Sequence, residues 1–347
     1  MVSAASYEAR AFGIYASMPL AKAYHLCPQA ILIKGNLKLY QEVSHKFMDI
    51  LSDFSPCIEP CGLDEAFIDT SGYEQPFGSY NLMAMAIKER VCKELAIVAS
   101  IGIAQCKVVA KIASALCKPD GLLEIAPGEE RRFLAPFPVA KLPGVGEKTE
   151  LILKNININT VGALASVQSH VIRKYLGSLG LLLHSYANGV DNRNVEAPGE
   201  SESISKEVTF SRDTRERHFL DVCLHGLCDE VGMELRFQNR RAKCITLKVR
   251  YADFETISRQ VTSKGANSIS RAVYTIARQL LDRVLLEKRK PIRLLGIKAS
   301  GLLDREQQYC MFDLAGQRWE SLDKAIDKIR MKYGNTSIRS GSDISTH

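Results

Sequence analysis

Between residues 204 and 300 the chain alternates apolar segments in an order that few folds accommodate. Four short runs rich in β-branched residues predict strands, and two longer segments with helical periodicity predict helices. In chain order these segments are 204–210, 218–236, 245–251, 256–262, 268–286 and 292–300. Their β-α-β-β-α-β order is typical of a split βαβ fold, in which one face of the sheet is left free by the helices.

This predicted domain also holds most of the positive charge. Residues 201–300 contain 20 Lys and Arg against 12 Asp and Glu, whereas the whole chain has a net charge of +7. Part of that charge lies on the predicted strands, at Lys206, Lys243, Lys248, Arg250, Arg293 and Lys298. We therefore expect the free face to be basic, with nucleic acid as the first candidate partner and a merely solvated face as the alternative.

The remaining features of the composition describe a multidomain protein of ordinary hydrophobicity. A length of 347 residues predicts about two to four domains, and the Pro/Gly/Ser-containing segment 197–203 is a candidate linker. No apolar run approaches the ~18 residues needed to span a bilayer, and the residues before Arg10 lack the features of a signal peptide. We expect a cytoplasmic protein with no membrane contact. Its ten scattered cysteines, without a C-x-x-C pair, predict reduced thiols rather than a zinc site.

Residues 57–69 predict a β-hairpin that carries two adjacent acids. Two short apolar runs flank a turn containing Gly62, and Asp64 and Glu65 stand at the start of the returning strand. Neighbouring carboxylates repel each other unless a divalent cation lies between them. Mg²⁺ is commonly held by one or two carboxylates together with substrate phosphates. A solvated Asp-Glu turn is the alternative for this dipeptide taken alone.

Two other segments predict phosphate binding. A helix starting near Ser6 places Tyr7 and Arg10 on one face, where an aromatic ring and a guanidinium could grip a triphosphate. A later helix carries Lys107 and Lys111, for which a solvated helix face and phosphate binding are equally plausible. Lys118 follows in a turn and is the better phosphate-binding candidate of the three lysines.

A Pro-Gly-x-Gly string precedes another predicted helix. Gly144 and Gly146 would expose backbone N–H groups near a helix N-terminus, and Lys148 follows within the first turn. Such a helix–hairpin–helix turn can hold a DNA phosphate without reading sequence. A plain turn between helices is the alternative.

These strings together resemble the Y-family translesion DNA polymerases of the DNA polymerase IV (DinB/UmuC) type. The resemblance extends from residue 2 to residue 303. It rests on the strings at 6–10, 63–66, 107–121, 142–146 and 203–209, which occur in the order of that family.

The resemblance implies an α+β multidomain protein with the architecture of a right-hand polymerase. Fingers, palm and thumb would be followed by a little-finger domain with the β-α-β-β-α-β order, and then by a clamp-binding peptide and a C-terminal helix. The implied boundaries are 1–36, 37–125, 126–195, 202–303 and 304–347.

The resemblance also implies a role for each candidate residue. Asp64 and Glu65 would be catalytic and hold two Mg²⁺ ions. The other implied contacts are Tyr7, Arg10 and Lys118 with the dNTP; Gly144, Gly146, Lys148, Ser203, Lys206, Arg293 and Lys298 with primer–template DNA; and Gln308, Met311 and Phe312 with a sliding clamp. The protein would act as a monomer.

One departure from the family pattern concerns the start of the chain. Family members have a first palm strand, bearing a third metal-binding Asp, ahead of the point that matches Met1. No similar string occurs in this sequence. We therefore expect the chain as written to be catalytically impaired and a longer product to be active. A non-catalytic protein that binds DNA and the clamp is the alternative expectation.

Overall fold

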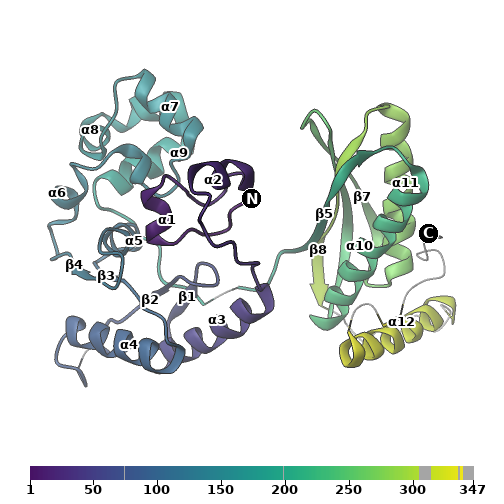
Figure 1. Ribbon diagram of the computed structural model, residues 1–347, viewed down its shortest axis with the longest axis horizontal. Coiled ribbons are helices and arrows are strands. Elements are labelled where there is room, and N and C mark those ends of the chain that lie inside the picture. Colours follow the sequence, from purple (N-terminus) through teal and green to yellow (C-terminus); the bar gives the residue numbers. More distant parts are fainter. Residues whose placement is uncertain (74, 198, 305–313, 335–336, 339–347) are drawn as a thin grey trace. The chain divides into compact units, whose positions relative to one another are not determined.

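The protein folds into two separate compact units (Figure 1). The structure is a computed structural model that describes residues 1–347 apart from 74, 198, 305–313, 335–336 and 339–347. Unit 1 comprises Met1–Gly199 and unit 2 comprises Glu200–His347. The division falls inside the segment 197–203, which was predicted to be a linker.

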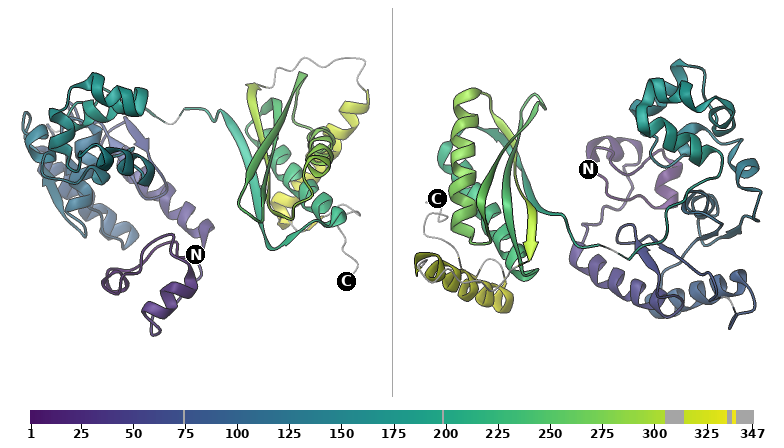
Figure 2. Two further views of the ribbon diagram at one scale, coloured as in Figure 1. Left: turned by 90° about the horizontal axis from the view of Figure 1, so that it is seen from above. Right: turned by 180° about the vertical axis from the view of Figure 1, so that it is seen from behind.

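Unit 2 has the predicted β-α-β-β-α-β order. Its four strands form one antiparallel sheet in the order β5-β8-β6-β7, and helices α10 and α11 cover one face (Figure 2). The strands extend further than the apolar pattern predicted. The elements are β5 Ser203–Thr214, α10 Arg217–Phe237, β6 Arg240–Tyr251, β7 Thr256–Asn267, α11 Ser270–Glu287 and β8 Ile292–Asp304.

The sequence explains why this sheet has one covered and one free face. Along β6, Leu247 and Val249 are fully buried, whereas Lys248 and Arg250, which alternate with them, are partly exposed. This period of two sends apolar side chains to the helices and basic ones away from them. In the described part of unit 2, no helix covers the face that carries Lys248.

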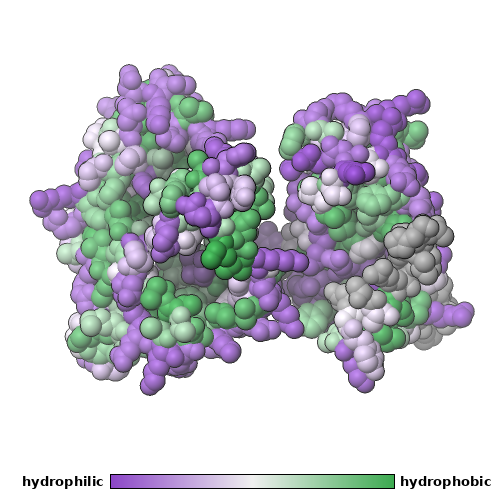
Figure 3. All heavy atoms as spheres, viewed as in Figure 1, coloured by the Kyte–Doolittle hydropathy of each residue, from purple (hydrophilic) through white to green (hydrophobic). Residues whose placement is uncertain are grey.

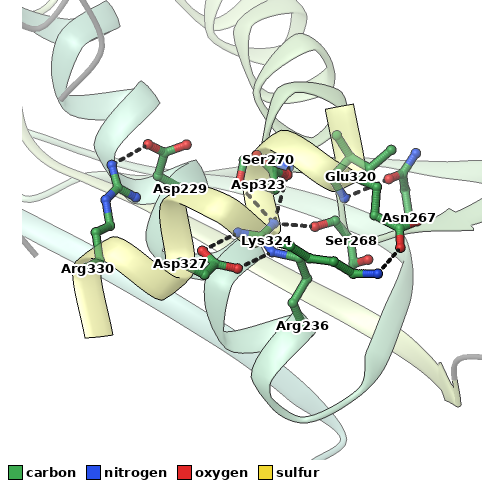
Figure 4. Close-up of polar contacts among 11 residues, drawn as sticks. Asp229, Arg236, Asn267, Ser268, Ser270, Glu320, Asp323, Lys324, Asp327 and Arg330 are labelled. Atoms are coloured by element: carbon green, nitrogen blue, oxygen red, sulfur yellow. Dashed lines mark hydrogen bonds and ion pairs between the residues drawn. The ribbon is translucent and has the colours of Figure 1, made fainter. Parts of the chain in front are cut away.

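A last helix, α12 Leu314–Tyr333, lies against α10, within the range 304–347 in which a C-terminal helix is implied. It docks through charged side chains rather than an apolar stripe (Figure 4). Arg236, which is only 6% exposed as a side chain, donates to Asp323 at 2.9 Å and to Asp327 at 2.6 Å. Arg330 adds an ion pair with Asp229 at 3.1 Å.

Unit 1 contains two small sheets over a shared helical layer. Strands β1 and β2 pair antiparallel, and β3 and β4 pair parallel. Helices α3 and α4 supply the buried residues of one apolar cluster, against which both sheets pack. The elements up to this point are α1 Tyr7–Ala11, α2 Leu20–Leu26, α3 Leu37–Ser52, β1 Ile58–Pro60, β2 Ala66–Ile68, α4 Tyr80–Leu95, β3 Ile101–Ile103, α5 Lys107–Leu116 and β4 Leu122–Glu124.

The rest of unit 1 is helical and shares a core with α5. That core joins residues from Val108 to Ala187, so the predicted boundary at 125/126 lies within a continuous apolar cluster. The division of unit 1 into fingers, palm and thumb stays a prediction. The remaining elements are α6 Glu130–Leu134, the 3₁₀ turn η1 Val139–Lys141, α7 Glu147–Asn155, α8 Val161–Ser166 and α9 Ser169–Ala187.

Apolar side chains are exposed on part of unit 1. In Figure 3 they gather near the connection between α2 and α3, where Ile31 is 88% and Ile33 is 85% exposed. Elsewhere polar residues dominate the visible surface. Among the helices that the structure describes, none has the length and apolar character required to cross a membrane.

Candidate active site and nucleic-acid-binding surfaces

The hairpin predicted at 57–69 is present and presents its two acids at the turn. Glu59 pairs with Phe67 across β1 and β2, and the Cys61 amide donates to the Glu65 carbonyl at 2.8 Å. Asp64 and Glu65 therefore stand next to each other where the second strand begins. Both side chains are exposed and accessible to a ligand from solvent.

Two lysines of α5 hold this hairpin from one side. Lys111 Nζ lies 2.7 Å from Glu65 Oε2, and Lys107 Nζ lies 2.6 Å from Glu59 Oε2. Because the lysines are four residues apart, they occupy the same face of the helix. Neither forms part of a merely solvated face, and sequence spacing alone gave no indication of their carboxylate partners.

The lysines also set the charge state of Glu65. The hydrogen bond from Lys111 lowers the pKa of the Glu65 carboxyl, and burial opposes this effect. The charge of Lys118 contributes further lowering, which places this lysine within electrostatic reach of the hairpin. The structure thus associates Glu65, Lys111 and Lys118, two of which were predicted site residues.

The chemistry of the acid pair fits a hard divalent cation. Asp64 and Glu65 offer carboxylate oxygens, the ligands that Mg²⁺ prefers. Across the residues that the structure describes, no group of three or more His, Cys, Asp and Glu side chains is arranged to hold a metal. Asp64 and Glu65 could supply part of the shell of such a cation, with phosphate oxygens and water among the further ligands. Lys111 bonds Oε2 of Glu65.

Tyr7 and Arg10 lie together as predicted. Ser6 caps α1 by accepting from the Ala9 amide at 3.3 Å, and the Arg10 guanidinium stacks 5.1 Å from the centre of the Tyr7 ring. Arg10 Nε also donates to the Ala5 carbonyl at 3.1 Å. Both side chains are exposed, so the guanidinium is positioned but keeps donors available for a ligand.

The Pro-Gly-x-Gly turn differs in one respect from the predicted helix–hairpin–helix. The element before it is the single 3₁₀ turn η1, because Pro138 and Pro143 leave too few residues between them for an α-helix. Gly144 has φ +92°, a conformation that L side chains rarely adopt. Gly146 is the N-cap residue of α7, and the position that a Cβ atom would occupy there has no close neighbour. Lys148 is exposed in the first turn of that helix. The turn can therefore be approached closely by a phosphate.

The uncovered face of the unit 2 sheet is polar and partly basic. Lys298 and Lys248 belong to it, because they lie opposite Thr246 and Gly296 on the neighbouring strands. Lys248 Nζ pairs with Glu207 at 2.7 Å, across the strand that carries Gly296. A side chain at Gly296 would meet the Glu207 Cβ at 2.9 Å, so this glycine leaves room for the ion pair.

The prediction that Lys206 lies on the uncovered face is wrong. Lys206 pairs with Ile297 in the β5–β8 register, and opposite residues of an antiparallel pair point to the same face. Ile297 is buried in the core beneath the helices, so Lys206 points to that side at the edge of the sheet.

Arg293 and Ser203 lie near opposite ends of the sheet. Arg293 occurs where the β6–β8 register shifts, with its guanidinium 3.6 Å from Asp213 and 4.7 Å from the centre of the Phe254 ring. Ser203 pairs with Ser300 near the opposite end. The predicted clamp-binding residues Gln308, Met311 and Phe312 lie outside the described residues.

Models of one protein family match both units. The impB/mucB/samB family matches residues 1–115, and the C-terminal domain of this family matches 201–311. The IMS family HHH motif matches 127–158, which includes the Pro-Gly-x-Gly turn.

Similar proteins cover nearly the whole chain. DNA polymerase IV of Dehalococcoides mccartyi is 46% identical over 341 residues, which cover 98% of this chain and 87% of the relative. DNA polymerase IV of Clostridium perfringens is 35% identical over 318 residues, covering 90% and 88%. A solved Y-family DNA polymerase chimera of Dbh and Dpo4 is similar with a TM-score of 0.79 at 25% identity, covering 87% of each chain. A DinB family error-prone DNA polymerase from Sulfolobus solfataricus has a TM-score of 0.58 at 25% identity, covering 88% and 91%.

These relatives do not favour the alternative of a non-catalytic DNA- and clamp-binding protein. Polymerases of this family use divalent metal ions, in agreement with the paired carboxylates on the hairpin. The chain therefore belongs to the Y family of DNA polymerases, as a DNA-directed DNA polymerase of the DNA polymerase IV type, whose reaction is template-directed synthesis past damaged bases.

Proposed function

We propose that Asp64 and Glu65 are the catalytic carboxylates and hold two Mg²⁺ ions during nucleotide addition. The observation that carries this proposal is the exposed acid pair at the hairpin turn, next to Lys111 and Lys118. Bound Mg²⁺ would activate the primer 3′-hydroxyl and neutralise charge on the triphosphate.

Arg10 and Lys118 would supply the cationic contacts of a triphosphate. Arg10 is suited to two-pronged binding of phosphate oxygens because its planar guanidinium is already oriented by Tyr7 and Ala5. Lys118 supplies a flexible point charge close to Glu65. We assign these side chains, with Tyr7, to the incoming dNTP.

Primer–template DNA would contact both units without sequence readout. In unit 1 the turn with Gly144, Gly146 and Lys148 offers backbone and side-chain donors to one phosphate. In unit 2 we assign Ser203, Arg293 and Lys298 to the phosphate backbone, and Lys206 to a weaker contact at the edge of the sheet. Further proposals are action as a monomer in the cytoplasm and clamp binding through Gln308, Met311 and Phe312.

Primer extension tests the assignment of the acids. We expect the chain to extend a primer with Mg²⁺ and four dNTPs more slowly than a longer product that carries the first palm strand, and Asp64→Ala/Glu65→Ala to abolish extension in both while primer–template binding is kept. Glu42→Ala removes an exposed carboxylate of α3 and is the control that should keep activity. Extension by the double variant would refute the metal-binding role, and a template with an abasic site would test bypass in the same assay.

A further inference from the structure

The chain that leaves unit 1 is fixed to this unit beyond its last helix. Residues 188–196 have no regular secondary structure, yet several contacts hold them. The Cys106 thiol lies 3.4 Å from the Gly189 carbonyl. Arg193 pairs with Asp191 at 2.7 Å and stacks 5.2 Å from the centre of the Tyr186 ring. The Asp191 side chain is almost completely buried.

One buried lysine fixes the end of this segment. Lys107 is 7% exposed, and its ammonium donates both to Glu59 at 2.6 Å and to the Asn194 carbonyl at 2.7 Å. The Glu196 amide donates to the same Glu59 oxygen at 3.0 Å. Three segments far apart in the sequence, namely β1, α5 and residues 194–196, are therefore joined at one ion pair.

The start of unit 2 is held in a similar way. Glu200 forms an ion pair with Arg240, whose side chain is only 15% exposed and also approaches Asp304 at 3.5 Å. Glu200 thus belongs to unit 2, and Glu196 belongs to unit 1. Only residues 197–199 separate the two anchored positions.

These anchors determine how far apart the units can move. The four Cα steps from residue 196 to residue 200 span at most about 14 Å when fully extended. If loss of the Lys107 contacts also releases the contacts of residues 189–193, the connection begins at the end of α9 near residue 188. Its twelve steps would then span up to about 43 Å, roughly threefold more.

We propose that Lys107, Glu59 and Arg240 are positioning residues that set the length of the tether between the two units. Provided that it still spans both binding sites, a shorter tether raises the effective concentration of one binding unit at a ligand already held by the other. This inference goes beyond the proposed catalytic roles, and its DNA-binding consequence rests on the proposal that both units contact DNA. Since effective concentration falls roughly as the −3/2 power of length, release of Lys107 is expected to weaken primer–template binding about fivefold.

The first test compares Lys107→Met with Lys111→Met. Both variants remove a lysine of α5 that holds the hairpin, but only Lys107 contacts residues 194–196. We expect trypsin to cut after Arg193 rapidly in Lys107→Met and slowly in wild type and in Lys111→Met. DNA dissociation constants, measured by fluorescence anisotropy, should rise about fivefold in Lys107→Met.

A second test avoids the buried site. Glu200→Gln removes the ion pair with Arg240 at an exposed residue, so the first anchored position of unit 2 moves toward Ser203. The tether from residue 196 then has seven Cα steps, and we expect DNA binding to weaken about twofold. Glu202→Gln removes the same charge two residues later and should have no effect. Protection of Arg193 in Lys107→Met would overturn the anchor, whereas rapid cleavage with unchanged DNA affinity would overturn the tether's role. The catalytic proposal can fail independently of the tether proposal, because a failure of the catalytic roles would be seen only in primer extension.

Discussion

Lys111 is the side chain that most strongly favours the ionised form of Glu65 at the acidic hairpin. Its ammonium is the main cause of the lowered pKa of Glu65, and it bonds Oε2, one of the two carboxylate oxygens. Glu65 is therefore held ionised and oriented before any metal binds. The lysine favours the ionised form but also competes with a metal ion for it.

Replacement of Lys111 by methionine is expected to raise the pKa of Glu65 toward its ordinary value of 4.5. In the wild type, the ion pair stabilises the folded state fully above this value, and the contribution is lost as the pH falls through the lowered pKa. Titration of the Glu65 carboxyl by NMR measures the shift. Lys118→Met should give a smaller rise, and an unchanged pKa in Lys111→Met would contradict the pairing.

For individual residues, the sequence predicted those contacts that join residues close to each other in the chain. Tyr7 and Arg10 share a helix face by spacing, and Asp64 and Glu65 share a turn, so both pairs were predicted correctly. Lys206 was placed on the wrong face although the sequence contains the signal. It alternates in phase with Ile204 and Val208, both of which pack into the core.

At the scale of secondary-structure elements, α12 is held by an unusual surface. Arg236 is nearly buried and donates to Asp323, to Asp327 and to the Ser268 carbonyl (Figure 4). Burial raises the pKa of Asp323, although the charge of Arg236 opposes this effect. The helix therefore depends on the completeness of one ion-pair network rather than on apolar area.

Arg236→Met is expected to release α12 while leaving the sheet of unit 2 folded. Loss of the guanidinium leaves two largely buried carboxylates without this partner, which costs about 3–5 kcal/mol when a buried pair is broken. Hydrogen exchange should show loss of protection in 314–333 and little change in β6. The control is Lys324→Met, which removes a half-exposed lysine of the same helix. Equal protection of α12 in Arg236→Met and wild type would contradict its docking role.

The sequence predicted the existence of most elements but not this docking surface. Apolar periodicity identified α10 and α11 because their buried faces are apolar. For α12 the buried face is charged, and its partner Arg236 precedes Asp323 by 87 positions. No local pattern connects residues so far apart, so the orientation of the helix required the structure.

For the whole molecule, the uneven charge predicts how DNA binding depends on salt. Each lysine that neutralises a phosphate contributes about one to the slope of log K against log salt concentration. We expect Lys298→Ala to reduce this slope by about one, because Lys298 lies exposed on the uncovered face. Lys206→Ala removes the same charge from the helix-covered side and should change the slope less. Equal changes would contradict the assignment of faces, and the measurement is a salt titration of primer–template affinity.

The two units also have separate apolar cores. The core of unit 2 uses residues from 204 to 302, and the core clusters of unit 1 use residues up to 187. A genetic crossover between codons 196 and 200 would separate no residues that share a core, so neither part would need repacking. One of the similar solved structures is itself a Y-family chimera. Recombination between relatives should therefore tolerate breakpoints in this short interval far better than breakpoints inside either unit.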